Sequence, residues 1–324
     1  MSIIVSHATA RSIYRLVDRP LQRHKTPVAM RTLLDAAPTK SDLEKLRHFL
    51  TYEGLPEEEQ GTIDALVLRQ KNLRHIEGLR QHCATASIGN RHFIRLDSGV
   101  FIVDICLCAL QAATDLSFRE LVEYYYELCG SYTILYGTKS EYRERNPLTT
   151  VEELSRFFKH SKGVKGAAKA RRAIAYVRNG CRSPLETAFV MTLVLPKSEG
   201  GLGIRNFQTD HHVAITLRAR DLTRRESVFF DAYLPRSKTD IEYNGFMHDT
   251  FEQQTIDEER KNALQAMGYR VITVNRHSFF DPASFKRVMT AICRAEGIRP
   301  SSFPTGFPVL QEQLRRFVLR RYYV

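Results

Sequence analysis

The sequence predicts an α/β protein of about two domains. Its 324 residues suit two domains of ordinary size. Towards the C-terminus, two short apolar strands joined by a turn (228–235 and 240–249) precede an amphipathic helix and a third strand (259–274). The N-terminal half carries short strands and helices in no regular order, so we expect a mixed α+β region there. We assign this region to 1–150, a second domain to 151–297, and a C-terminal tail with a short helix to 298–324.

The composition is that of an ordinary globular protein. The chain is 43% hydrophobic and 26% charged, and no apolar run approaches the roughly 18 residues that a membrane span needs. Its first residues lack the basic flank and the apolar core of a signal peptide. Six cysteines are scattered without a CxxC pair, which argues against zinc and against disulfides. We therefore expect a cytoplasmic protein with reduced thiols and no membrane partner.

Local signals predict the elements of the N-terminal region. Strands are predicted at the short apolar runs 3–5, 92–96 and 100–103. Ser6 is a candidate N-cap for a helix that runs through residue 16. Ser41 is a plausible N-cap for a second helix over 41–50, whose leucines recur at helical spacing.

Helical patterns dominate from Ile105 onward. One helix is predicted to end at Gly130, and another begins at the threonines 149–150. Ser183 followed by proline at the first helical position begins a helix over 185–195. The glycines of 200–203 predict a turn, because the strand–loop–helix context of a phosphate-binding loop is missing.

The net charge of +12 is concentrated in clusters. From Leu154 to Arg182 the chain has basic residues but no acidic one. Such clustering is expected of a polyanion-binding protein, and equally of a solvated helix face on a basic protein. The acidic residues inside the C-terminal strands favour nucleic acid as the partner. The predicted nucleic-acid contacts in this segment are Lys165, Lys169, Arg171 and Arg172.

Three carboxylates are the main candidates for chemistry. Asp231 and Glu242 lie in neighbouring apolar strands, where an unpaired carboxylate is costly to bury. A shared divalent metal explains both, since hard cations take oxygen ligands, and an ion pair with a nearby arginine is the alternative. Glu186 stands in the first turn of the preceding helix, where it either joins this site or complements the helix dipole.

Four further residues are candidates for the same site as Asp231 and Glu242. Asn244 follows Glu242 by two positions, and its amide oxygen can ligate a metal but cannot act as a base. His248 comes after the next turn and is a candidate general base. Arg260 and Lys261 belong to the following helix and either contact a scissile phosphate or are solvated.

The order of these motifs resembles the PD-(D/E)XK nuclease superfamily. The matching segments, within 181–295, are Ser-Pro-Leu-Glu, Phe-Asp-Ala-Tyr-Leu-Pro, Ile-Glu-Tyr-Asn-Gly-Phe-Met-His and Met-Gly-Tyr-Arg-Val-Ile-Thr-Val. More closely, they resemble the small domains related to the very-short-patch-repair endonuclease. Such domains also occur at the C-terminus of actinobacterial proteins similar to the type IV abortive-infection (AbiE) antitoxin.

This resemblance implies a restriction-endonuclease-like mixed sheet flanked by helices. It implies that Glu186 lies on the first helix and that Asp231 and Glu242 hold Mg²⁺ or Mn²⁺. His248 falls at the histidine of the family's Glu-x-Asp-Gly-x-x-His pattern, whereas Asn244 stands where that pattern has Asp. We therefore expect a metal-dependent endonuclease-like protein that acts on DNA, with a role in phage defence.

Two other classes of function are compatible with the same residues. Because of Asn244, the fold could be a catalytically degenerate nuclease that serves as a DNA-binding or toxin-neutralising module. Its partner would then be DNA, a toxin or a regulatory protein. A protein-interaction scaffold is the third class, and the absence of DNA affinity at low salt would favour it.

Overall fold

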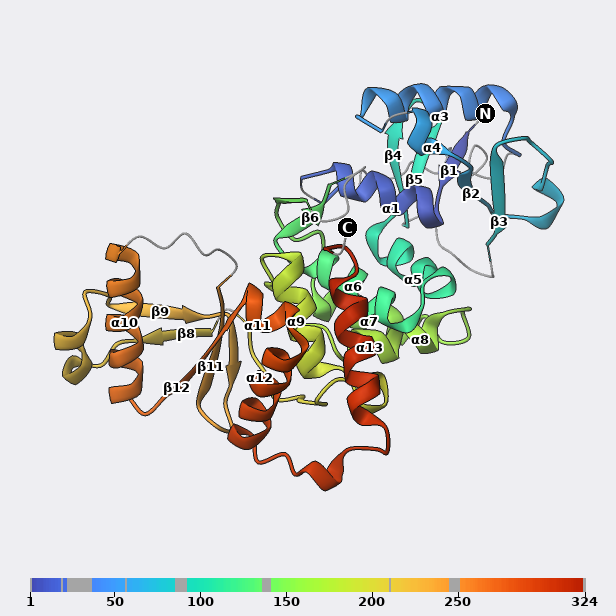
Figure 1. Ribbon diagram of the computed structural model, residues 1–324. Helices are drawn as coiled ribbons and strands as arrows, with labels where there is room; N and C mark the ends of the chain where they lie inside the picture. Colours follow the sequence, from blue (N-terminus) through green and yellow to red (C-terminus); the bar gives the residue numbers. More distant parts are fainter. Residues whose placement is uncertain are drawn as a thin grey trace. The chain divides into compact units, whose positions relative to one another are not determined.

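The computed structural model describes residues 2–18, 20–21, 37–55, 57–84, 92–135, 141–209, 211–244 and 251–322 (Figure 1). It has a mixed α/β architecture, and its contacts separate two compact units, Met1–Val177 and Arg178–Val324. The segment 151–177, which we assigned to the second domain, packs in the N-terminal unit, and the tail from 298 belongs to the C-terminal unit. Among the described residues, no helix is long and apolar enough to cross a membrane.

A five-stranded sheet forms the core of the N-terminal unit, in the strand order β3-β2-β1-β5-β4. The strands are β1 (Ile3–Val5), β2 (Ile63–Val67), β3 (Leu79–Cys83), β4 (Phe93–Asp97) and β5 (Val100–Val103). β1 runs parallel to β5 and antiparallel to β2, while β2 and β3 are parallel. The three strands predicted in this region are therefore confirmed. β1 and β5 are buried along their whole length, which accounts for their unbroken apolar runs.

Helices cover this sheet and extend beyond it. They are α1 (His7–Leu16), α3 (Lys40–Tyr52), α4 (Glu57–Gln60), α5 (Ile105–Asp115), α6 (Phe118–Cys129), α7 (Val151–His160) and α8 (Ala167–Ile174). A 3₁₀ turn, η1 (Gln70–Asn72), and a hairpin of β6 (Tyr132–Ile134) and β7 (Tyr142–Glu144) complete the described part of the unit. α1 packs on β2 and α5, and α8 packs on α5, α6 and α7.

The caps of these helices differ in part from the prediction. The N-cap of α3 is Thr39 rather than Ser41, because the Thr39 hydroxyl accepts the hydrogen bond from the Asp42 N–H. Asp42 in turn accepts from the Thr39 N–H, so both orphan donors are satisfied. Ser6 does stand at the N-cap position of α1, but its hydroxyl lies 3.0 Å from His7 Nδ1 and makes no capping bond.

The C-terminal unit is built on a hairpin and a mixed three-stranded sheet. The strands are β8 (His211–Ala214), β9 (Ser227–Phe230), β10 (Ala232–Leu234), β11 (Thr239–Asn244) and β12 (Arg270–Asn275). β8 pairs with β9, β10 runs antiparallel to β11, and β12 runs parallel to β11. α10 (Phe251–Ala266) connects the two parallel strands. The sequence predicts a helix here, but from residue 259, and the helix begins eight residues earlier. Its Ala263 and Leu264 pack with Val213 and Phe230 of the hairpin in one buried cluster.

The remaining helices of this unit are α9 (Pro184–Val194), α11 (Arg276–Phe280), α12 (Pro282–Ala295) and α13 (Phe307–Leu319), with 3₁₀ turns η3 (Lys197–Glu199), η4 (Leu217–Leu222) and η5 (Pro300–Ser302). α9 begins as predicted, with Ser183 accepting from the Glu186 N–H and proline at the first helical position. The helix is apolar on nearly every side, so it is buried, and α13 packs against it. Figure 1 shows α10 beside β8 and β9, and α9 and α12 on the other side of β11.

Candidate functional site

Asp231 and Glu242, the predicted metal ligands, lie on neighbouring chain segments. Asp231 joins β9 to β10, and the pairing of Ala232 with Ile241 brings it beside the C-terminal half of β11. Its Oδ2 accepts a hydrogen bond from the Tyr243 N–H at 3.0 Å. This bond fixes Asp231 against β11, next to Glu242.

A further carboxyl group, that of Asp240, belongs to the same cluster, although the sequence analysis missed it. Asp240 and Glu242 are two positions apart on β11, so their side chains point to the same face of the strand. Asp240 is fully buried. Burial, and then the charge of Glu242 and a hydrogen bond with it, raise the pKa of Asp240 well above its ordinary value. The alternation of the strand could have revealed this residue.

Arg260 of α10 supplies the positive charge of the cluster. Its guanidinium forms an ion pair with Glu242 and lies 3.4 Å from Asp240 Oδ2. It also donates to the Phe229 carbonyl at 3.1 Å. Asp240 Oδ1 is buried and has no hydrogen-bond partner among the described residues. Lys261, predicted together with Arg260, is exposed, so the structure brings only Arg260 to the carboxylates.

Glu186 lies in the first turn of α9, close enough to Asp231 for their charges to interact, and its role in the site stays a prediction. Its Oε2 accepts from the Arg182 N–H at 2.8 Å, which ties it to the start of α9. Burial raises the pKa of Glu186 to about 7, and the negative charge of Asp231 contributes to the rise. Glu186 is therefore bonded to the backbone just before the Ser183 cap and lies within electrostatic range of Asp231.

Asn244 and His248 are two further residues that the sequence predicts for the site. Asn244 is the last residue of β11, where its backbone pairs with Asn275 of β12. His248 lies outside the described residues, so its predicted role as a base stays a prediction.

The four basic residues predicted to grip nucleic acid belong to the N-terminal unit, with three of them in α8. Lys165 is exposed, but the other three make contacts within their unit. Lys169 Nζ donates to the carbonyl of Leu116 and Arg171 to that of Phe158. The Arg172 guanidinium lies 4.2 Å from the centre of the Phe118 ring. The expectation of a fully solvated helix face is thus only partly right.

The donors of the carboxylate cluster fit a divalent cation in their chemistry. Oxygen ligands are what Mg²⁺ and Mn²⁺ prefer, and a cation would relieve the repulsion that raises the pKa of Asp240. In the part of the chain that the structure describes, no three His, Cys, Asp or Glu side chains are already arranged to hold a metal ion. Arg260 instead supplies the positive charge that balances the carboxylates.

Comparison of the chain with protein-family models, curated proteins and solved structures finds no match to any of them.

Proposed function

We propose that the C-terminal unit is a metal-dependent, endonuclease-like domain with a restriction-endonuclease-like fold, which acts on DNA. The observation that carries this proposal is the gathering of Asp231, Asp240 and Glu242 from adjacent chain segments, with Glu186 near Asp231 and with one guanidinium, that of Arg260, paired to Asp240 and Glu242. The order of elements supports it as well: a buried helix, antiparallel strands, and a crossover helix leading to a parallel strand. A role in phage defence follows only from the resemblance.

In this proposal Asp231 and Glu242 hold Mg²⁺ or Mn²⁺. The bound cation would polarise a scissile phosphate and lower the pKa of an attacking water. Arg260, which neutralises Asp240 and Glu242 in the absence of a cation, would then be available to donate to a phosphate oxygen. The raised pKa of Glu186, about 7, suits a group that exchanges a proton near neutral pH, and His248 assists proton transfer.

A cleavage assay tests the proposal. The protein is incubated with plasmid, linear and single-stranded DNA in Mg²⁺ or Mn²⁺, and we expect metal-dependent nicking or cutting. Asp231→Ala should lower the rate at least roughly 100-fold, because it removes one of two metal-binding carboxylates. Glu226→Ala removes an exposed carboxylate next to β9 and should leave the rate unchanged. No cleavage under any condition, or equal cleavage by Asp231→Ala, would sink the proposal.

The second candidate is a non-catalytic module that binds DNA or neutralises a toxin. Arg260 favours it, since the ion pairs of this residue already compensate the carboxylates without a metal. Calorimetric titration separates the two candidates. If Mg²⁺ and Mn²⁺ do not bind while DNA does, the module is correct, whereas metal binding that disappears in Asp231→Ala supports the nuclease.

A further inference from the structure

The N-terminal unit contains a cavity of about 380 Å³ that the proposed nuclease chemistry does not use. Leucines of β2 and α5 line one part of it, and the polar lining consists of His7, His82, Gln111, Thr114, Asp115 and Lys165. A volume of this size suits a small-molecule ligand, and a mostly apolar wall with a few converging polar groups is usual for such sites. The polar groups decide which ligand the cavity fits.

Two histidines form one wall, and each has one ring nitrogen fixed. The rings of His7 and His82 are stacked, with centres 3.6 Å apart and an angle of 16° between their planes. His82 Nε2 lies 2.7 Å from Asp64 Oδ1, and the Arg80 guanidinium binds both oxygens of that carboxylate. Although burial opposes it, hydrogen bonds from His82 and Arg80 lower the pKa of Asp64, so the carboxylate is ionised at neutral pH.

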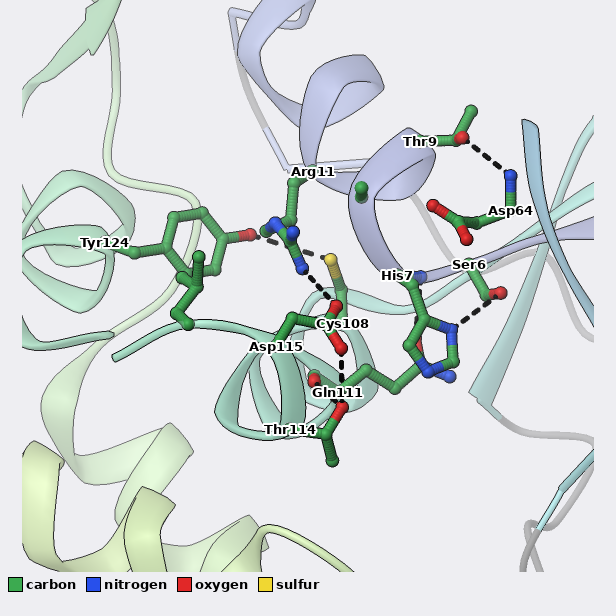
Figure 2. Close-up of polar contacts among 12 residues, drawn as sticks. Ser6, His7, Thr9, Arg11, Asp64, Cys108, Gln111, Thr114, Asp115 and Tyr124 are labelled. Carbon is green, nitrogen blue, oxygen red and sulfur yellow. Dashed lines mark hydrogen bonds and ion pairs between the residues drawn. The ribbon is translucent and has the colours of Figure 1, made fainter. Parts of the chain in front are cut away.

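His7 is fixed through both its backbone and its ring. Its backbone N–H donates to Gln111 Oε1 at 3.1 Å, and its Nδ1 lies 3.0 Å from Ser6 Oγ (Figure 2). Burial, and then the neighbouring His82, lower the pKa of His7 to about 4, so this ring is neutral at pH 7. When Nδ1 accepts from the Ser6 hydroxyl, the ring proton is on Nε2. Since Gln111 uses its carbonyl oxygen for His7, its amide nitrogen remains as a donor. His7 and Gln111 therefore both present neutral N–H groups.

Each carboxylate near the cavity is paired with an arginine, so that one positive charge, the ammonium group of Lys165, is left without a negative partner in the described part of the chain. Asp115 pairs with Arg11 at 3.0 Å and accepts from the Thr114 hydroxyl at 2.8 Å (Figure 2). Asp64 is compensated in the same way by Arg80. Lys165 lines the cavity, is exposed, and forms no ion pair with any residue that the structure describes. The lining thus offers an ammonium group and neutral donors to an anion.

The stacking of the two rings argues against a metal ligand here. A ligand nitrogen binds a metal in the plane of its own ring, at about 2.0–2.1 Å for zinc. Parallel rings 3.6 Å apart cannot both meet that condition for one ion. An anion that accepts hydrogen bonds has no such requirement.

We propose that this cavity binds a phosphomonoester, carried either by a free nucleotide or by the 5′ end of a DNA strand. Lys165 provides the charge, and the His7 ring N–H and the Gln111 amide provide hydrogen bonds to the phosphate oxygens. The leucines of β2 and α5 receive the apolar part of the ligand. This site is separate from the carboxylate cluster and does not depend on nuclease activity.

The test is calorimetry on the full-length protein in EDTA, so that metal binding in the C-terminal unit has no influence on the result. Adenosine 5′-monophosphate is compared with adenosine, and a 5′-phosphorylated oligonucleotide with its unphosphorylated form. We expect each phosphorylated ligand that enters the cavity to bind at least about tenfold more tightly than its partner. Binding of the mononucleotide alone identifies a free nucleotide, and binding of the oligonucleotide alone identifies a strand end.

Two variants and a control locate the effect. Lys165→Ala should weaken phosphomonoester binding about tenfold, and Lys162→Ala, a nearby exposed lysine outside the lining, should not change it. Gln111→Glu keeps the acceptor for the His7 N–H but places a negative charge in the cavity, and it should abolish binding. Equal affinity for phosphorylated and unphosphorylated ligands overturns the proposal, as does an equal response to the Lys165 and Lys162 substitutions.

Discussion

At the scale of single residues, the carboxylate cluster is defined by burial as much as by charge. Asp240 is fully buried, and the side chains of Glu242 and Arg260 are 13% and 14% exposed. In such surroundings an ionised carboxylate needs a partner, and the guanidinium of Arg260 pairs with both Asp240 and Glu242. Proton uptake by Asp240 is the second way in which the cluster lowers its charge.

Glu186→Gln tests the burial of the helix carboxyl. Because folding raises the pKa of Glu186 from 4.5 to about 7, the folded state binds the proton more tightly than the unfolded state. The contribution of Glu186 to stability is then full below pH 4.5 and is lost as pH rises to about 7. The glutamine variant should match the parent protein near pH 4 and exceed it by roughly 1–3 kcal/mol at about pH 8. Urea denaturation at both pH values measures the difference, and a difference that does not change with pH would contradict the assignment.

Arg260→Gln tests the ion pairs. Removing the guanidinium leaves Glu242 without compensation in a largely buried place, so we expect a decrease of about 3 kcal/mol in the free energy of unfolding at neutral pH. Lys261→Gln, on the exposed side of the same helix, should change it by less than about 0.5 kcal/mol. Chemical denaturation compares the two variants, and equal effects would show that Arg260 does not hold the cluster together.

At the scale of elements, the turn after α9 shows what the glycines at 200–203 do. Gly200 has a φ of +90°, and a Cβ there would collide with the backbone carbonyl of Leu310 in α13. The predicted turn is confirmed, and its glycine also permits the close approach of two helices. Gly268, which follows α10, has a similar φ of +82° but open space around its Cα.

Because Gly200 and Gly268 share a left-handed backbone but differ in their surroundings, the same substitution at both positions separates the two effects. Gly268→Ala should cost about 1–2 kcal/mol, because alanine is strained in a left-handed backbone. Gly200→Ala carries the same cost and must also move the turn after η3 away from α13, so we expect a decrease in stability at least about twice as large. Thermal unfolding of both variants provides the comparison. Equal decreases in stability would mean that glycine is required at position 200 by the left-handed backbone of the turn, and not by the packing of α13.

The sequence predicts those elements that have a strong local signal. These include the cap at Ser183 with its proline, the buried strands β1 and β5 and the strand after α10. The helix α12 and the strand β8 were missed. α12 does carry a local signal, since Asp281 is its N-cap and a proline follows, whereas β8 is defined by its pairing with β9. The cap at Thr39 instead of Ser41 shows how local signals can compete, since both residues can cap a helix and each has an acid three positions on.

The same limit applies to the candidate site. Asp231 and Glu242 are recognisable because each is an acid in an apolar strand, whereas Asp240 stands at the polar start of its strand, where an acid is ordinary. The spacing of two residues from Glu242 places Asp240 on the same face of β11, and the register with β10 and the ion pair with Arg260 show that Asp240 belongs to the cluster. The stacked pair of His7 and His82 is separated by much of the N-terminal unit in sequence, and no local pattern connects its members.

At the scale of the whole molecule, the acid-free segment Leu154–Arg182 crosses the boundary between the two units. Its basic residues are therefore not one helix face. Lys169 and Arg171 bond to carbonyls at or near the ends of α5 and α7, where positive charge also complements the helix dipoles. Lys165 remains exposed. A contribution of this segment to nucleic-acid binding has to be measured against these structural contacts.

The salt dependence of DNA binding measures the contribution of this segment. If Lys165, Lys169, Arg171 and Arg172 neutralise phosphates, replacing all four with alanine should flatten the log–log plot of affinity against salt. The slope should change by about 0.9 for each phosphate that the variant no longer neutralises.

The control replaces the exposed arginines at 218, 220, 224 and 225, which removes the same net charge from the other unit. Circular dichroism checks that both variants fold, since three of the four side chains in the first also hold α8 in place. If both variants flatten the slope equally, overall charge explains the binding. A flatter slope in the first variant alone assigns the phosphate contacts to this segment.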